Sequence, residues 1–167
     1  MTVPTAASPA QRPPHPLLRL YRRIPDALVL LLARVSIAVT FWVSGQTKIE
    51  GLVLDPIRGN ISLGVPRLSG NAVELFRHEY ALPLLPPVFA AQMAAVAEHV
   101  LPLLLVLGLA TRLSASALLA MTLVIQLFVY PLAWPTHMLW AALLLLLMAK
   151  GAGPLSLDGM LARRRAG

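Results

Sequence analysis

Two ionisable side chains, Arg34 and Glu98, lie well inside stretches of the sequence that are otherwise apolar. A charged side chain at the centre of a bilayer costs about 2 to 3 kcal/mol or more, so each of them needs a partner. At 1.5 Å per residue, Arg34 lies roughly 10 to 12 Å and Glu98 roughly 15 Å from the same side of the membrane, a difference that an arginine side chain spans. We therefore predict an ion pair between Arg34 and Glu98, which either fixes the helix register or handles a proton.

His99 follows Glu98 directly and points in a different direction, because consecutive residues of a helix are about 100° apart. A metal site on His99 needs further ligands, and the nearest candidates, Met93 and Met121, fit packing positions. The chain has no cysteine, which excludes disulfide relay chemistry, thioether-attached haem and thiolate-bound iron–sulfur clusters. We therefore expect no metal, haem or iron–sulfur site, and any redox role needs a borrowed cofactor.

A second group of polar and aromatic residues gathers at the predicted outer ends of the apolar segments. Gln126 and His137 each lie about one turn inside the hydrocarbon boundary, where a polar group needs a hydrogen-bond partner. They can bond to each other or hold a head group. The aromatic residues are also typical of the belt that membrane proteins place at the interface. The candidates for binding the head group of a lipid-soluble cofactor are Trp42, Lys48, Gln126, Tyr130 and His137.

Four apolar segments must position these residues. The chain is 57% hydrophobic and only 13% charged, and its mean hydropathy is +0.73. A helix of about 20 residues crosses the hydrocarbon core of a bilayer, which is about 30 Å thick. The composition therefore predicts an all-α integral membrane four-helix bundle over residues 27–152, with spans at about 27–45, 88–108, 113–130 and 134–152.

The loop between the first two spans is long and balanced in charge. Val73, Phe76 and Tyr80 recur at helical spacing on one face of its second half. An amphipathic segment of this kind lies in the plane of the membrane interface. We expect a short interfacial helix on the outer surface.

Basic residues are concentrated in the two tails, residues 1–26 and 153–167. The positive-inside rule then places both chain ends in the cytoplasm, in agreement with an even number of spans. The net charge of +7 is explained by these tails beside anionic lipid, so no nucleic-acid partner is expected. The first span is too long for the apolar core of a cleavable signal peptide, and we expect it to stay as an anchor.

Five short motifs follow one another at the span ends. They are an arginine in the first span (Arg34), SGxxK at its exit (Ser44, Gly45, Lys48), a glutamate in the second span (Glu98), GLATR at its end (108–112) and GxGPLSLD after the fourth (151–158). In this order they resemble the DoxX/DoxD-like family of small four-helix membrane proteins.

The resemblance implies a multi-pass protein of the bacterial inner (plasma) membrane. Some members of the family are described as membrane subunits of quinone-linked oxidoreductases, and others as partners in oxidative or metal stress systems. Arg34, Lys48 and Glu98 fall on the family pattern. The stretches LFRHEYALPLLPP and FVYPLAWPTH further resemble a subgroup met in bacteria beside machinery for modified, metal-chelating peptides.

The leading interpretation is a lipoquinone-binding membrane subunit of an oxidoreductase or stress-response complex, which is not catalytic alone. Gln126, His137 and Lys48 would bind the carbonyls of a noncovalent quinone, while Arg34 and Glu98 handle the proton or fix the bundle. The alternative is a noncatalytic membrane partner in metal or oxidative stress handling, which docks a protein through the outer loop. A transporter, the third reading, needs a homo-oligomer because four spans carry no internal repeat.

Overall fold

The structure is a computed structural model that describes residues 23–55 and 59–166. Within this part of the chain, four helices are long and apolar enough to cross a membrane: Asp26–Gln46, Pro87–Leu107, Thr111–Val129 and Pro131–Lys150. The predicted spans are therefore confirmed as helices, with ends that shift by one to three residues. The chain is a multi-pass membrane protein, and the side on which its ends lie stays a prediction.

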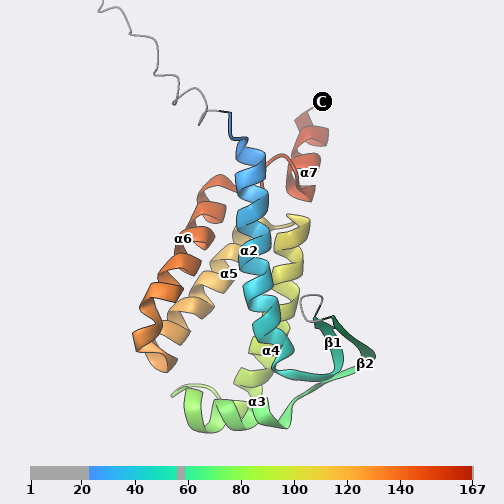
Figure 1. The fold of residues 1–167 in the computed structure, drawn as a ribbon. Helices are drawn as coiled ribbons and strands as arrows, with labels where there is room; N and C mark the ends of the chain where they lie inside the picture. The colour runs from blue at the N-terminus through green and yellow to red at the C-terminus, as the bar shows by residue number, and fades with distance from the viewer. Residues whose placement is uncertain (1–22, 56–58, 167) are drawn as a thin grey trace, which may run out of the picture.

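The four spans form one bundle in which α2 (Asp26–Gln46) lies between α4 (Pro87–Leu107) and α6 (Trp134–Lys150). The helix α5 (Thr111–Val124), extended by the π-helical segment η2 (Ile125–Val129), lies beside α6. A short 3₁₀ turn, η3 (Pro131–Ala133), joins η2 to α6. The start of α2 and the last helix, α7 (Leu157–Ala166), lie at the same end of the bundle (Figure 1).

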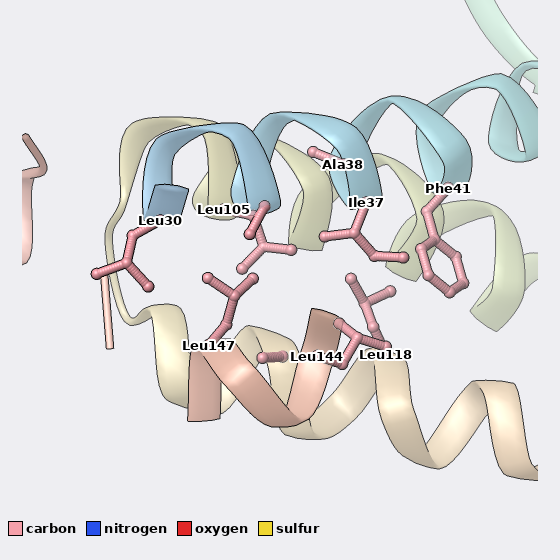
Figure 2. Packing of buried hydrophobic residues seen from close by; sticks show 10 residues of the cluster. Leu30, Ile37, Ala38, Phe41, Leu105, Leu118, Leu144 and Leu147 are labelled. Atoms are coloured by element: carbon pink, nitrogen blue, oxygen red, sulfur yellow. The ribbon is translucent and has the colours of Figure 1, made fainter. Parts of the chain in front are cut away.

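Large aliphatic side chains fill the middle of the bundle. Leu30, Ile37 and Phe41 point from one face of α2 toward leucines of α5 and α6 (Figure 2). The outer faces of the spans are apolar as well, with Leu32 58% and Leu103 50% exposed. Such a surface is stable in lipid and not in water, as expected for membrane-spanning helices.

Small residues let α2 and α4 approach closely, as the alanines of these spans suggest from the sequence alone. Ala38 and Ala91 are buried at 1% and 0% exposure. At Gly45 an added Cβ atom would lie only 2.8 Å from Cε1 of His99. Gly45 is therefore a point of close contact between α2 and α4.

The long loop folds at the opposite end of the bundle from α7. It begins with an antiparallel hairpin of β1 (Ile49–Asp55) and β2 (Asn60–Leu68). It continues with α3 (Gly70–Leu75) and the π-helical turn η1 (Phe76–Tyr80), where the sequence predicts a short helix. The hairpin was not expected, because its glycines and Pro66 are typical of turns.

Candidate functional site

The buried cluster at the hairpin end of α2 consists of Ser44, Lys48 and Glu98. Lys48 and Glu98 are each 2% exposed, and Nζ of Lys48 lies 2.6 Å from Oε2 of Glu98. Ser44 Oγ donates a hydrogen bond of 3.1 Å to Oε1 of Glu98 and accepts one of 3.1 Å from Nζ. The two charges therefore compensate each other, as burial in a membrane protein requires.

The spacing of the SGxxK motif follows from how α2 ends. After Gln46 the chain turns tightly, with the Lys48 amide donating to the Gly45 carbonyl at 2.9 Å. Nζ of Lys48 then folds back over the last helical turn and donates to the Ser44 carbonyl at 3.3 Å. A Cβ atom at Gly45 would lie 3.0 Å from Cβ of Glu98. The motif thus supplies the hydroxyl, the close approach to α4 and the cation of one site.

A cavity of about 200 Å³ opens beside this ion pair. Its polar groups come from Lys48, Glu98 and Tyr80, and the rest of the wall is apolar. Met93, 54% exposed, and Leu85, 44% exposed, belong to this wall, so the cavity is continuous with the lipid-facing surface. The apolar residues of its wall are Phe76, Leu82, Leu85, Ala90, Met93, Ala94, Ala97, Met121, Val124, Ile125 and Val129.

Tyr80 connects the cavity to a pair of polar side chains outside the spans. Its ring meets the ring of Tyr130 edge-on at 5.8 Å, and the Tyr130 hydroxyl donates a hydrogen bond to Glu79. Burial, followed by the negative charge of Glu98, raises the pKa of Tyr80. The hydrogen bond to Glu79 raises the pKa of Tyr130 in the same direction. Both phenols therefore stay protonated near neutral pH and act as hydrogen-bond donors.

The predicted pair of Arg34 with Glu98 is wrong. Glu98 lies against Gly45, which follows Arg34 by three helical turns and therefore by about 16 Å along α2. The prediction placed both residues at similar depths, whereas the real stagger of α2 against α4 separates them. Arg34 is fully buried near the other end of α2.

Three backbone carbonyls hold the guanidinium of Arg34. Its Nη1 donates to the carbonyls of Leu105 and Val106, each at 3.4 Å, and its Nη2 donates to that of Leu155 at 2.5 Å. Gly108, at φ +66°, leaves room for this contact, since a Cβ atom there would lie 2.1 Å from Nη1. Arg34 thus ties α2 to the end of α4 and to the segment that follows α6.

The two motifs GLATR and GxGPLSLD complete the same end of the bundle. Both carboxylate oxygens of Asp158 accept hydrogen bonds of 3.0 Å, from the amides of Ala110 and Thr111 at the start of α5. The amide of Asp158 donates to the carbonyl of Gly108 at 2.9 Å. An anion at a helix N-terminus satisfies free N–H groups and is favoured by the helix dipole. These motifs therefore join helices at the end of the bundle that Arg34 occupies.

Gln126 and His137 form the mutual hydrogen bond that the sequence suggests. Nδ1 of His137 lies 2.7 Å from Oε1 of Gln126, and Nε2 of Gln126 donates to the carbonyl of Pro131 at 2.8 Å. The imidazole also lies against Trp140, with ring centroids 5.0 Å apart. Neither Gln126 nor His137 belongs to the wall of the cavity beside Lys48.

Trp42 of α2 and His99 of α4 contact each other on a different side of α4 from the ion pair. Nε1 of Trp42 donates to the carbonyl of Leu54 in the hairpin at 2.9 Å, and its ring meets His99 edge-on at 5.0 Å. His99 bonds to the carbonyl of Ala95 at 2.6 Å and to Nε2 of Gln46 at 2.9 Å. His99 and Glu98 thus face different partners, as the helical spacing predicts.

The five predicted head-group residues are therefore separated among four places. Lys48 lies in the cavity wall, Tyr130 contacts Tyr80 behind that wall, and Gln126 with His137 forms a closed pair. Trp42 holds the hairpin. Tyr80 cannot be recognised as a cavity residue from the sequence, because its helical spacing fits an interfacial face equally well.

The sequence model of the DoxX family matches residues 29–131 of this chain. The matched region covers more than half of the sequence and includes Arg34, Lys48, Glu98 and the GLATR motif. No curated protein and no solved structure shows significant similarity to the chain.

Proposed function

We propose that this protein, which belongs to the DoxX family, binds the head group of a lipoquinone in the cavity beside Lys48 and Glu98. In this role it serves as the membrane subunit of an oxidoreductase or stress-response complex whose other component supplies the electrons. The observation that carries the proposal is the position of a buried ion pair in the wall of an apolar cavity that is continuous with the lipid-facing surface. Structural ion pairs have no need of such a cavity.

The cavity fits the ring of a quinone head group in size, and its nearly apolar wall includes the polar residues Lys48, Glu98 and Tyr80. A single substituted ring is apolar on its faces and carries two oxygens, and about 200 Å³ accommodates the ring but not a long tail. The tail would leave past Met93 and Leu85 into the bilayer. The phenol of Tyr80 is a donor for a carbonyl oxygen, and the Lys48 ammonium places a positive charge beside it.

Glu98 supplies the acceptor that the reduced form of such a ligand needs. Its Oε2 lies 2.6 Å from the Lys48 ammonium, and its Oε1 accepts the hydrogen bond from Ser44 Oγ. A carboxylate oxygen has more than one lone pair, so in this proposal Oε2 accepts a further hydrogen bond from a hydroxyl group of the ligand beside its contact with Lys48. A lipoquinone, when bound, supplies the electron chemistry, and the chain supplies orientation and charge.

This proposal gives up the head-group role predicted for Gln126 and His137 and the proton-handling role predicted for Arg34. Gln126 and His137 satisfy each other and support the turn between the third and fourth spans, and Arg34 has no part in proton handling in this proposal. Lys48 keeps the head-group role predicted from the sequence, and Tyr80 and Glu98 join it in this proposal.

The test is the lipoquinone content of the protein purified from native membranes in mild detergent, measured by mass spectrometry after solvent extraction. Ala97→Phe places a ring into the cavity wall, whereas Ala120→Phe, the matched control, adds the same ring to the exposed face of α5. We expect near-stoichiometric quinone in the wild type, in Ala120→Phe and in His137→Ala, and a loss in Ala97→Phe. Quinone at the background lipid ratio in the wild type would refute the proposal and favour the noncatalytic docking role.

A further inference from the structure

A groove of about 480 Å³ lies between the hairpin and α4, on a different side of α4 from the quinone cavity. None of its lining residues is shared with that cavity. Its polar side chains are Arg67 of β2 and Gln92 and His99 of α4, and the remaining lining is apolar. The apolar residues are Trp42, Ile49, Leu52, Pro66, Leu68, Ala95, Val96, Val100 and Leu103.

The floor of the groove is a lipid-facing stripe of a membrane-spanning helix. Val96, Val100 and Leu103 follow one another at helical spacing and are 61%, 47% and 50% exposed. From Gln92 to Leu103 the groove extends about 16 Å along α4, enough for a large part of an acyl chain. The groove is thus continuous with the surface that the bilayer covers.

The hairpin that forms the other wall carries an uncovered apolar face. Leu52 lies opposite Leu63, and Leu54 lies opposite Ile61, so these four side chains share one face. Ile61 and Leu63 are 69% and 79% exposed. An apolar face of this kind is unfavourable in water and favourable within the acyl region of a leaflet.

Fixed hydrogen bonds hold the hairpin in this position. Trp42 Nε1 donates to the carbonyl of Leu54, and the amide of Leu54 donates to Oε1 of Gln46 at 2.8 Å. A two-stranded hairpin is marginally stable alone, so these bonds to the end of α2 matter for keeping the groove open. The groove is therefore a formed feature of the fold.

Arg67 supplies a cation at the rim of the groove. Its side chain is exposed, and no ion pair to it is formed by the residues that the structure describes. Glu50 lies opposite Arg67 in the strand register but outside ion-pair distance. A guanidinium beside an apolar groove that opens onto lipid is complementary to a phosphodiester with an attached acyl chain.

We propose that the groove between the hairpin and α4 is a binding site for one anionic phospholipid of the leaflet on the hairpin side. One acyl chain lies along Val96, Val100 and Leu103, and Arg67 binds the phosphate. The bound lipid fills the gap under the hairpin and completes the packing of the hairpin against the bundle. The site does not depend on quinone binding.

The test uses photoactivatable phosphatidylglycerol in phosphatidylcholine nanodiscs that contain the full-length protein, with labelled residues mapped by mass spectrometry. We expect labelling of Val96, Val100 and Leu103 several-fold above that of other exposed residues of α4. Val96→Trp, which fills the groove, should abolish this excess. Val88→Trp is the matched control, because Val88 is 44% exposed on the same helix and lies outside the groove lining. It should retain the excess.

The charge of Arg67 is tested by competition. Unlabelled phosphatidylglycerol should displace the probe better than phosphatidylcholine by about fivefold, the effect of one basic side chain near the membrane surface. Arg67→Gln should remove this preference, whereas Arg77→Gln, which removes one charge from the same end of the protein, should keep it. Uniform labelling of α4, or labelling that Val96→Trp leaves unchanged, would overturn the proposal. So would a cross-linked dimer that excludes the probe from the groove, because the occupant would then be a second copy of the chain.

Discussion

Two buried cations in the described part of the chain, Arg34 and Lys48, differ in what surrounds them. Arg34 is bound by three backbone carbonyls and lies at the end of the bundle where α4, α5 and the segment after α6 meet. Lys48 is bound by the carboxylate of Glu98 and by Ser44, and it lines a cavity. Partners fixed in the backbone suit a structural joint, whereas a side-chain carboxylate beside a cavity can exchange protons and bind a ligand. The comparison teaches that a charge inside the membrane is not by itself a sign of chemistry.

The largest effect on stability is expected from Arg34→Ala. The substitution leaves three carbonyls without their charged donor inside the bundle, which should lower the free energy of unfolding by about 3 kcal/mol or more. Thermal unfolding in detergent, followed by tryptophan fluorescence, measures the change. The quinone content per folded molecule should stay at the wild-type level, and a selective loss of quinone in a folded Arg34 variant would remove the contrast between the two clusters.

Glu98→Ala should destabilise the protein by about 3 kcal/mol, because it leaves the Lys48 ammonium buried without its counter-charge. The lost stability can be rescued at this pair, because both charged partners are side chains that can be replaced. No such rescue exists for Arg34, whose partners are backbone carbonyls. The double variant Lys48→Met with Glu98→Leu replaces both charges with apolar groups and should recover most of the lost stability. The same double variant should contain no quinone. A double variant that is as unstable as Glu98→Ala would show that the pair is needed for folding.

Gly108→Ala tests the joint at Arg34 through the backbone. The added Cβ atom would lie 2.1 Å from Nη1 of Arg34, so we expect a loss of about 2 to 3 kcal/mol from strain and the displaced side chain. Gly59→Ala is the matched control, since Gly59 also has a positive φ but no atom within 4 Å of the added Cβ. It should cost about 1 kcal/mol. Equal melting temperatures for the two variants would show that the Arg34 contact carries little stability.

The smallest effect is expected from Tyr80→Phe, and it depends on pH. The raised pKa of Tyr80 means that the folded state disfavours the phenolate, so the associated stability is present below the ordinary value of 10.0 and is lost as the pH rises above it. The variant should match the wild type in stability near neutral pH and lose less stability above pH 10. Melting curves of both proteins across this range check the difference. If Tyr80→Phe lost as much stability above pH 10 as the wild type, the titration of Tyr80 would not be a cause of that loss.

The spans could be predicted from the sequence because a helix that crosses lipid must be long and apolar, and long apolar segments are directly visible in the sequence. The partners of Arg34 could not be predicted in this way, because the stagger of α2 against α4 depends on the close approach at Gly45 and on the segment after α6. The cavity was missed for a similar reason. Tyr80 and Phe76 are brought to α4 by the loop, and their spacing alone fits an interfacial helix as well as a cavity wall.

The hairpin shows another limit of local patterns. Gly51, Gly64 and Pro66 weaken the strand signal, and the register is irregular between Glu50 and Leu52. The strands are instead held by tertiary contacts that strand propensity does not reveal. One of them is the hydrogen bond from the Trp42 indole to the Leu54 carbonyl. In contrast, the mutual bond of Gln126 and His137 is one of the two arrangements that the sequence suggests, because two polar groups inside the membrane boundary need partners.

The most direct test of the contrast between the two clusters is the lipoquinone content, per folded molecule, of two variants purified from native membranes. Arg34→Lys keeps a cation at the joint, and Lys48→Met with Glu98→Leu keeps the fold without the charges of the cavity. The account predicts wild-type quinone content in the first variant and none in the second. Equal quinone in both, or a loss confined to Arg34→Lys, would contradict it.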